Sequence, residues 1–153
     1  MTVTIRPAHE ADYPRVCAIM QQVHDLHVAW RPDVYRPCEP ALPRETFLQA
    51  IAHGLFFVAD HQGAVSGILS CMERRIGSDR QAARRVLFID TMAVDEPSRG
   101  QGIGRQLLDF ARQYAAAHAY DGLELQVNAR NEAARAMYAR CGFTEKSINM
   151  ELL

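Results

Sequence analysis

A glycine-rich turn constrains the fold of this chain more than any other feature of its sequence. Residues 99–105 spell Arg-Gly-Gln-Gly-Ile-Gly-Arg, and they separate an apolar segment from an amphipathic one. The first turn of a helix has unpaired N–H groups and a positive dipole end, and both favour an anion. Alternating glycines let the backbone approach a pyrophosphate without a Cβ clash. The residues expected around the phosphates are Arg99, Gly100, Gln101, Gly102, Ile103, Gly104 and Arg105.

Two other phosphate-binding motifs do not fit this turn. A P-loop ends in Gly-Lys-Ser/Thr, whereas Gly104 is followed by Arg-Gln. The dinucleotide pattern G-x-G-x-x-G would need a glycine at position 103 or 105, and it is expected early in a βαβ unit rather than two-thirds along the chain. The remaining alternative is a flexible loop in which the glycines occur by chance. The position of the glycines between a strand and a strong helix disfavours this alternative.

The apolar periodicity predicts alternating strands and helices along the rest of the chain. Strands are expected at about residues 2–6, 55–59, 64–72, 85–94, 123–128 and 143–153, the last as one strand or as two with a break near Lys146. Helices are expected at about residues 12–28, 44–53, 102–118 and 131–140. The order β-α-α-β-β-β-α-β-α-β predicts an α/β (α+β) fold in which a mixed, mostly antiparallel sheet is flanked by about four helices. The 153 residues fit a single domain, 1–153.

Composition excludes several classes of protein. Apolar residues make up 48% and charged residues 23% of the chain, which is ordinary for a folded domain and argues against disorder. The net charge of −1 argues against a nucleic-acid partner. No apolar stretch is long enough to cross a bilayer, and residues 1–10 do not resemble a signal peptide, so no membrane partner and a cytoplasmic location are expected.

No metal or disulfide framework is expected. The four cysteines lie far apart without a C-x-x-C pair, which favours free thiols. His24 and His27 are three residues apart, but no third ligand follows at a telling spacing. A basic cluster is expected on a solvated loop, with an anion-attracting rim as the alternative. Its members are Arg74, Arg75, Arg80, Arg84 and Arg85.

The glycine-rich turn resembles a known motif. Arg99-x-x-Gly102-x-Gly104, after a strand that ends in Met92-Ala93-Val94, is similar to the acetyl-CoA-binding motif of the GNAT superfamily of N-acetyltransferases. This resemblance implies that acetyl-CoA is the co-substrate and that the turn contacts its pyrophosphate.

A second motif strengthens the resemblance. Residues 131–143 are similar to the superfamily signature N-x-x-A-x-x-x-Y-x-x-x-G-F. The resemblance implies that Tyr138 is the general acid toward the CoA sulfur, and that Asn131 contacts the pantetheine arm on a helix face shared with Ala134. A core tyrosine with a satisfied hydroxyl is the alternative. The two motifs cover roughly residues 86–143, and the N-terminal half resembles the family only in element order.

Two further catalytic groups follow from the same strand. In the family a bulge or splay frees a backbone N–H for the oxyanion, and Val94 is the matching position. Asp90 interrupts an apolar run in mid-strand, so its carboxylate must face a wet cleft or hold a partner. It is a candidate general base because several family members carry an acidic residue on this strand, with a purely structural role equally open. Glu73 is a weaker candidate.

The acceptor pocket is expected between the first helices and the sheet. His24, His27, Trp30 and Tyr35 concentrate aromatic and polar groups there, next to a proline-rich segment. Simple packing of Trp30 under a loop is the alternative. The leading hypothesis is acetyl transfer to a small primary amine or an amino acid. A peptide or protein N-terminal acetyltransferase and a non-catalytic CoA-binding sensor stay open, as does a homodimer, since dimers are common in the superfamily.

Overall fold

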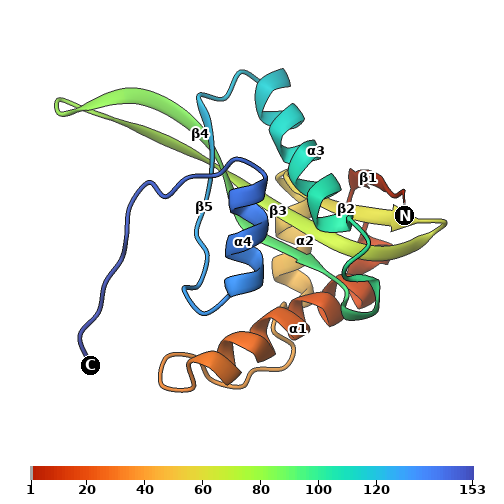
Figure 1. Cartoon of the computed structure of the whole chain (residues 1–153). Coiled ribbons are helices and arrows are strands. Elements are labelled where there is room, and N and C mark those ends of the chain that lie inside the picture. Colours follow the sequence, from red (N-terminus) through yellow and green to blue (C-terminus); the bar gives the residue numbers. More distant parts are fainter. Residues whose placement is uncertain (1) are drawn as a thin grey trace.

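The computed structural model describes residues 2–153 and contains one five-stranded sheet with helices on both faces (Figure 1). The strands are β1 (Thr4–Pro7), β2 (Phe56–His61), β3 (Ala64–Ser78), β4 (Gln81–Val94) and β5 (Gly122–Leu125). The helices are α1 (Tyr13–Trp30), α2 (Arg44–Ala52), α3 (Ile103–Ala117) and α4 (Glu132–Arg140), with the 3-10 turns η1 (Glu10–Asp12) and η2 (Glu96–Ser98). The strands follow one another in chain order across the sheet, and only the β4–β5 pair is parallel. The expected mixed sheet with four helices is confirmed.

The alternation of side chains along β2 separates the interior into two layers. Phe57 and Ala59 pack against α3 on one face, whereas Phe56 and Val58 pack against α1 and α2 on the other. All four residues are buried, as expected for a central strand covered on both sides. α3 buries one apolar stripe, formed by Ile103, Leu107, Leu108, Ala111 and Ala115.

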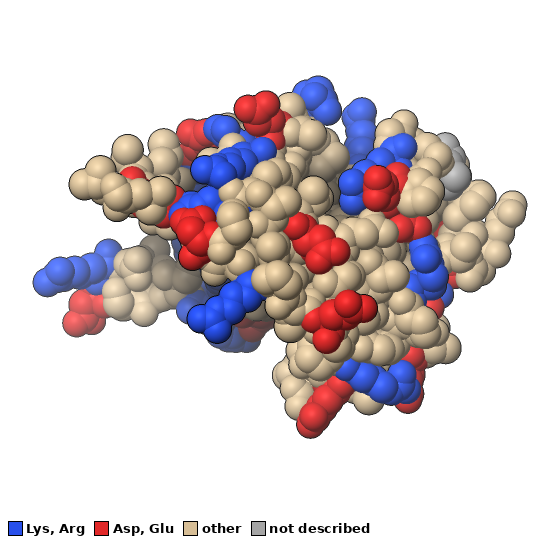
Figure 2. Space-filling view, turned by 90° about the horizontal axis from the view of Figure 1, so that it is seen from below, with Lys and Arg blue, Asp and Glu red and all other residues tan. Residues whose placement is uncertain are grey.

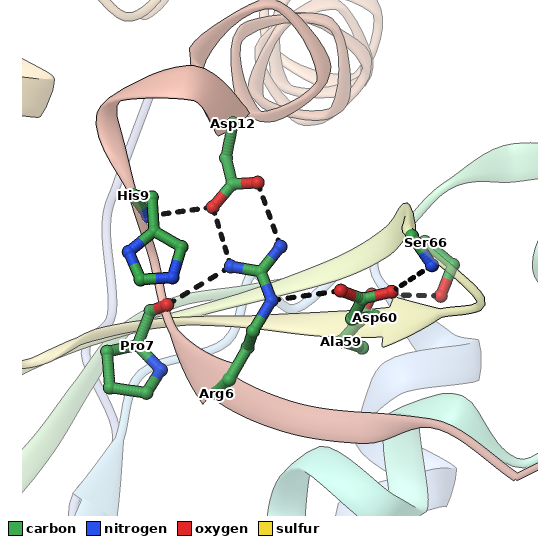
Figure 3. Close-up of polar contacts among 8 residues, drawn as sticks. Arg6, Pro7, His9, Asp12, Ala59, Asp60 and Ser66 are labelled. Atoms are coloured by element: carbon green, nitrogen blue, oxygen red, sulfur yellow. Dashed lines mark hydrogen bonds and ion pairs between the residues drawn. The ribbon is translucent and has the colours of Figure 1, made fainter.

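Arg6 ties the edge of the sheet to the start of α1 (Figure 3). Its guanidinium donates to both carboxylate oxygens of Asp12, at 2.8 and 3.0 Å, and to Asp60 on β2 at 2.9 Å. These hydrogen bonds lower the pKa of both carboxyl groups. β1 ends at Pro7, which pairs with Phe57 as the last residue of the ladder. Its missing N–H is tolerated on an edge strand.

Four members of the basic cluster lie on strands, Arg74 and Arg75 on β3 and Arg84 and Arg85 on β4, and Arg80 lies in the turn between them. β3 and β4 form a long hairpin whose register runs from Gly67 opposite Val94 to Ser78 opposite Gln81, and its tip extends away from the sheet (Figure 1). The expected strands 64–72 and 85–94 were therefore too short. The outer part of the hairpin is hard to recognise in the sequence, because both of its faces meet solvent and its residues therefore need no apolar alternation.

The expected strand at residues 143–153 is absent. This segment leaves the end of α4 as an extended tail that pairs with no strand of residues 2–153 (Figure 1). Its alternating apolar side chains suggested a strand. A strand also needs a neighbouring strand to pair with, and the sequence pattern of one segment does not show whether such a neighbour is present. Within residues 2–153, no helix has the length and hydropathy required to span a bilayer.

Candidate functional site

The two ends of β4 have different neighbours. Val86 to Ile89 pairs with β5 on one side and with β3 on the other. β5 ends its pairing opposite Ile89, so the stretch from Asp90 to Val94 keeps β3 as its only strand neighbour among residues 2–153. The sheet thus opens between β4 and β5, and this opening lies beside the N-terminus of α3.

The open edge of β4 offers backbone hydrogen-bonding groups. Gly67 and Val94 are opposite each other, and the N–H of Asp95 donates to the carbonyl of Ser66 at 2.9 Å. This bond identifies the Gly67–Val94 pair as a non-hydrogen-bonded one, in which the N–H and C=O groups point away from the partner strand. The Val94 N–H therefore points toward the opening. The separation of the strands that the family resemblance implied at Val94 is present.

A bulge in β4 sits at the start of the opening. Ser70 is opposite Thr91 and Cys71 is opposite Ile89, which leaves Asp90 without a partner on β3. Ile89 and Met92 both pack in the α3 layer, so the two residues between them turn to the other face together. Asp90 is exposed, and within residues 2–153 no group hydrogen-bonds its carboxylate. The residue that interrupted the apolar run therefore faces solvent.

The glycine-rich turn has the backbone conformation of an anion cradle. Gly100 and Gly102 have φ values of +76° and +84°, which L-residues with a side chain rarely adopt, and each has open space where a Cβ would point. The first helical hydrogen bond of α3 runs from the Gln106 N–H to the Gly102 carbonyl. The N–H groups of residues 102–105 consequently have no partner within the helix, and a phosphate fits this arrangement.

Gly104 has a different role from the other two glycines. It lies inside α3, and a Cβ added there would come within 3.1 Å of the Met137 sulfur and 3.8 Å of a Val94 methyl. A glycine at this position lets α3 approach both α4 and β4. The third glycine of the turn thus serves helix packing and brings the second motif next to the first.

A buried carboxylate braces the turn from α1. Asp95 follows β4 and is buried, and it accepts hydrogen bonds from Gln22 at 2.7 Å and from Arg15. Burial by itself raises the Asp95 pKa. The hydrogen bonds from Gln22, Arg15 and the Glu96 backbone lower it by more, so the net pKa is below its ordinary value. Gln22 also accepts from the Glu96 N–H at 3.0 Å. α1 thereby holds the segment that leads into the turn.

Sequence reasoning missed this brace. Its members lie some 73 to 80 residues apart, so no local pattern joins them. The one available signal was a carboxylate placed directly after an apolar strand, a position where burial demands a partner.

The two arginines of the turn differ in their contacts. The Arg99 Nε donates to the Val94 carbonyl at 3.0 Å, whereas no group of residues 2–153 pairs with the exposed side chain of Arg105.

α4 carries the second motif and begins with a side-chain cap. The Asn131 Oδ1 accepts from the Ala134 N–H at 3.2 Å, so the N-x-x-A part of the motif also makes an N-cap. Tyr138 is half-buried, and its ring meets Phe143 edge to face at 5.7 Å. Burial raises the pKa of its phenol. Within the described residues no group bonds the hydroxyl, and no fully buried side-chain polar atom is unpaired, so the hydroxyl keeps access to solvent.

The aromatic residues predicted for the acceptor pocket do cluster. The His27 ring lies 5.6 Å from Trp30 and 5.1 Å from Tyr35, and His24 lies 6.5 Å from Tyr35. His24 Nε2 donates to the Arg36 carbonyl at 2.7 Å, which secures the loop after α1. The Trp30 carbonyl accepts from Arg130, so this cluster adjoins the loop that leads from β5 into α4.

Glu73 is a poor base in this structure. It accepts from Arg85 at 2.6 Å and from Arg75 at 2.7 Å, and these bonds lower its pKa to about 2. Arg84 pairs with Glu124, and the Arg74 guanidinium lies 3.4 Å over the Phe88 ring. The basic cluster is thus largely engaged within the molecule. On the face drawn in Figure 2, cationic and anionic side chains are interspersed, unlike a surface that tracks a nucleic-acid backbone.

Known proteins match both halves of the chain. Residues 20–143 match the model of the Acetyltransferase (GNAT) family. A 5-NmdU N-acetyltransferase of Pseudomonas phage PaMx11 is 33% identical over 91 residues, which are 60% of this chain and 58% of that protein. An uncharacterized N-acetyltransferase of Methanocaldococcus jannaschii is 34% identical over 93 residues, 61% of this chain and 40% of that protein. The chain spans about half the length of these relatives.

Solved structures share the fold over the whole chain. The tetramutant of the BH1408 protein from Bacillus halodurans superposes with a TM-score of 0.89 at 30% identity, covering 98% of this chain and 99% of that one. An aminoglycoside N-acetyltransferase in complex with CoA superposes with a TM-score of 0.73 and covers 99% and 94% of the two chains. At 14% identity, the second likeness shows the fold alone.

Proposed function

The chain belongs to the Acetyltransferase (GNAT) family, and from that premise we propose that it transfers an acetyl group from acetyl-CoA to the nitrogen of a small primary amine or amino acid. The observation that carries the proposal is the position of three features: the unpaired N–H groups at the start of α3, the open edge of β4 beside them, and Tyr138 on the adjoining helix. One extended thioester could meet all three.

The donor is held mainly by backbone. The N–H groups of residues 102–105 and the left-handed conformation at Gly100 and Gly102 suit the pyrophosphate. Arg105 adds positive charge, and the exposed Gln101 lies at the outer edge of the cradle. Met92, Ala93 and Val94 would lie along the pantetheine arm, with Asn131 and Ala134 on the facing helix.

The chemistry needs a neutral amine, a donor for the oxyanion and a proton for the leaving thiolate. An alkyl amine has a pKa near 10, so it must lose a proton before it attacks the thioester carbonyl carbon. We assign that step to the Asp90 carboxylate, directly or through water, because the bulge turns it to solvent beside the opening. The new C–N bond forms at that carbon, and the Val94 N–H would stabilise the resulting oxyanion.

The collapse of this intermediate breaks the C–S bond and releases a thiolate. We assign the proton donor to this thiolate to the Tyr138 hydroxyl, and the phenolate that remains takes up the second proton of the attacking nitrogen, which the amide must lose. The raised pKa of Tyr138 keeps the phenol protonated at neutral pH, as a general acid requires. The amide product and CoA then leave, and the proton taken up by Asp90 returns to solvent. The His24, His27, Trp30 and Tyr35 cluster would contribute to the acceptor side.

A panel of amines with acetyl-CoA, followed by free-thiol release, tests the proposal. Turnover above background with at least one amine is expected. Tyr138→Phe should lower kcat roughly 10- to 100-fold, because it removes the proton donor and keeps the ring, while CoA affinity measured by calorimetry stays within about twofold.

A matched control is Tyr114→Phe, which removes a phenol from α3 on the side of Phe57, and full activity is expected. Absence of thiol release with every amine, combined with tight CoA binding, would instead identify a CoA-binding sensor. Activity on peptide N-termini alone would replace the small-amine assignment.

A further inference from the structure

Arg74 differs from the other arginines on the strands of the β3–β4 hairpin. Each of those is paired with a carboxylate, in the ion pairs Arg75–Glu73, Arg85–Glu73 and Arg84–Glu124. Arg74 is exposed, and among residues 2–153 no carboxylate pairs with it. Its guanidinium instead lies over the ring of Phe88. The hairpin thus carries one strand arginine whose charge is not neutralised by an ion pair within the described part of the chain.

The Phe88 ring holds the Arg74 guanidinium in a defined place. The central carbon of the guanidinium is 3.4 Å from the ring centroid, which is close contact, and Phe88 itself is buried. An aromatic face attracts a cation, and a stacked guanidinium keeps the N–H groups at its edge free for an anion. The contact also limits the rotamers that an exposed arginine would otherwise sample. Phe88 therefore presents the N–H groups of Arg74 in a preorganised position.

Asp90 lies on the same side of β4 as this stack. Leu87 and Ile89 pack in the α3 layer, so Phe88 between them points to the opposite side, and the bulge turns Asp90 to that side as well. Two residues along a strand span roughly 6.6 Å, so the carboxylate that we propose as the base is a near neighbour of the stack. Among residues 2–153 neither Arg74 nor Asp90 forms an ion pair, which leaves both charges for one ligand.

The charges on this side of the sheet leave an excess of one cation. Glu124 lies on this side of the neighbouring strand β5, but its carboxylate is already occupied. It accepts from Lys146 at 2.9 and 3.0 Å and from Arg84 at 3.3 Å. Together with Arg74, three cations accompany the two carboxylates of Glu124 and Asp90. A ligand with one anionic group would balance this surface.

We propose that Arg74 is a specificity-determining residue that selects acceptors carrying a carboxylate, and this inference rests on the proposed acetyl transfer. The guanidinium binds the carboxylate of the acceptor through two parallel hydrogen bonds, while the amine lies toward Asp90. Met72 is 41% exposed opposite Phe88, and it offers an apolar surface for the carbon atoms between the two groups. The acceptor is then an amino acid rather than an amine without an anionic group.

The test compares amino acids with their carboxamides in the thiol-release assay with acetyl-CoA. The pairs are glycine and glycinamide, β-alanine and β-alaninamide, and 4-aminobutanoate and 4-aminobutanamide. The wild type should prefer at least one carboxylate over its carboxamide by about 10-fold or more in kcat/KM. Arg74→Gln should abolish this preference: kcat/KM for that carboxylate should fall about 10- to 100-fold, mainly through KM, because a charge-assisted bidentate contact is lost. For the carboxamide, kcat/KM should change less than about threefold.

Arg75→Gln is the matched control. It removes the same charge from the next residue, whose side chain points to the other side of the hairpin and pairs with Glu73, so both members of each pair should keep the wild-type kcat/KM. Arg74 and Arg75 are both exposed, and the thermal midpoints of the two variants should stay close to that of the wild type.

Equal losses for carboxylate and carboxamide in Arg74→Gln would overturn the inference and leave acetyl transfer intact, and so would a wild type that favours the carboxamides. Silence of the whole amine panel would instead remove the proposed function. Calorimetric titration of the same six amines into CoA-saturated protein then decides the inference separately. It stands if a carboxylate binds and Arg74→Gln weakens that binding about 10-fold or more, and it falls if no carboxylate binds or the variant binds equally well.

Discussion

The two halves of β4 belong to one strand but have opposite surroundings. Val86 to Ile89 lies between two strands, and each of its side chains is at most 5% exposed. Asp90 to Val94 has lost its neighbour on one edge, contains a bulge, and includes an exposed carboxylate. The first half stabilises the domain, because its backbone N–H groups pair with neighbouring strands. The second half presents backbone N–H groups that have no strand partner on one edge.

This difference shows how a sheet can expose backbone hydrogen-bonding groups at the end of a buried strand. A backbone N–H that is paired in a ladder cannot stabilise a ligand, so the strand must lose a neighbour first. The loss costs little here because the opening begins only after the buried segment ends. Three substitutions test the comparison, two on this strand and one at the residue directly after it, and they are ordered by their expected effect on stability.

Leu87→Ala should have the largest effect on stability. Leu87 is 1% exposed and packs in the α3 layer, so truncation leaves a cavity. A loss of about 3 kcal/mol in the free energy of unfolding is expected from urea titration. Leu87→Met, which keeps most of the volume, should lose less than about 1.5 kcal/mol. Similar losses for both variants would contradict the view that the first half is a closely packed core.

Asp95→Asn should have an intermediate effect that depends on pH. Its folded-state pKa is lowered, so the stabilisation by the charged form is present above the unfolded pKa of about 4 and is lost as pH falls through the folded pKa. At pH 7 the variant should be about 1–2 kcal/mol less stable, a modest value because Arg15 is half-exposed. The gap between wild type and variant should narrow below pH 4 in thermal unfolding. A gap that stays constant from pH 7 to pH 3 would show that the charge does not matter.

Asp90→Asn should have the smallest effect on stability and a large one on turnover. The side chain is exposed and unpaired within residues 2–153, so unfolding should change by less than about 0.5 kcal/mol. If Asp90 is the base, kcat/KM should fall about 100-fold or more in the amine assay. Glu73→Gln is the matched control on the neighbouring strand, and it should change kcat/KM less than about threefold. Equal activity losses in the two variants would remove the assignment of Asp90.

Local patterns predicted the elements nearest the site well. α3 and α4 lie within two residues of their expected bounds, because an apolar stripe of period 3.6 and a cap such as Asn131 are properties of a short segment. Glycine also permits the positive φ found at Gly100 and Gly102. The length of the β3–β4 hairpin did not follow, since a solvent-exposed ladder imposes no apolar pattern on either strand.

The sequence by itself selected the residues that we propose for the chemistry: the glycine-rich turn, the interrupting carboxylate at Asp90 and the helix with Asn131 and Tyr138. Residue type and spacing indicate local conformation and local reactivity, and both of these can be read without knowledge of the fold. Tertiary structure alone decided that β5 leaves β4 after Ile89, that Asp95 is braced by Gln22 and Arg15, and that the C-terminal tail is unpaired. Each of these depends on which distant segment lies alongside, and hydrogen bonds between distant segments leave no periodic trace in either one.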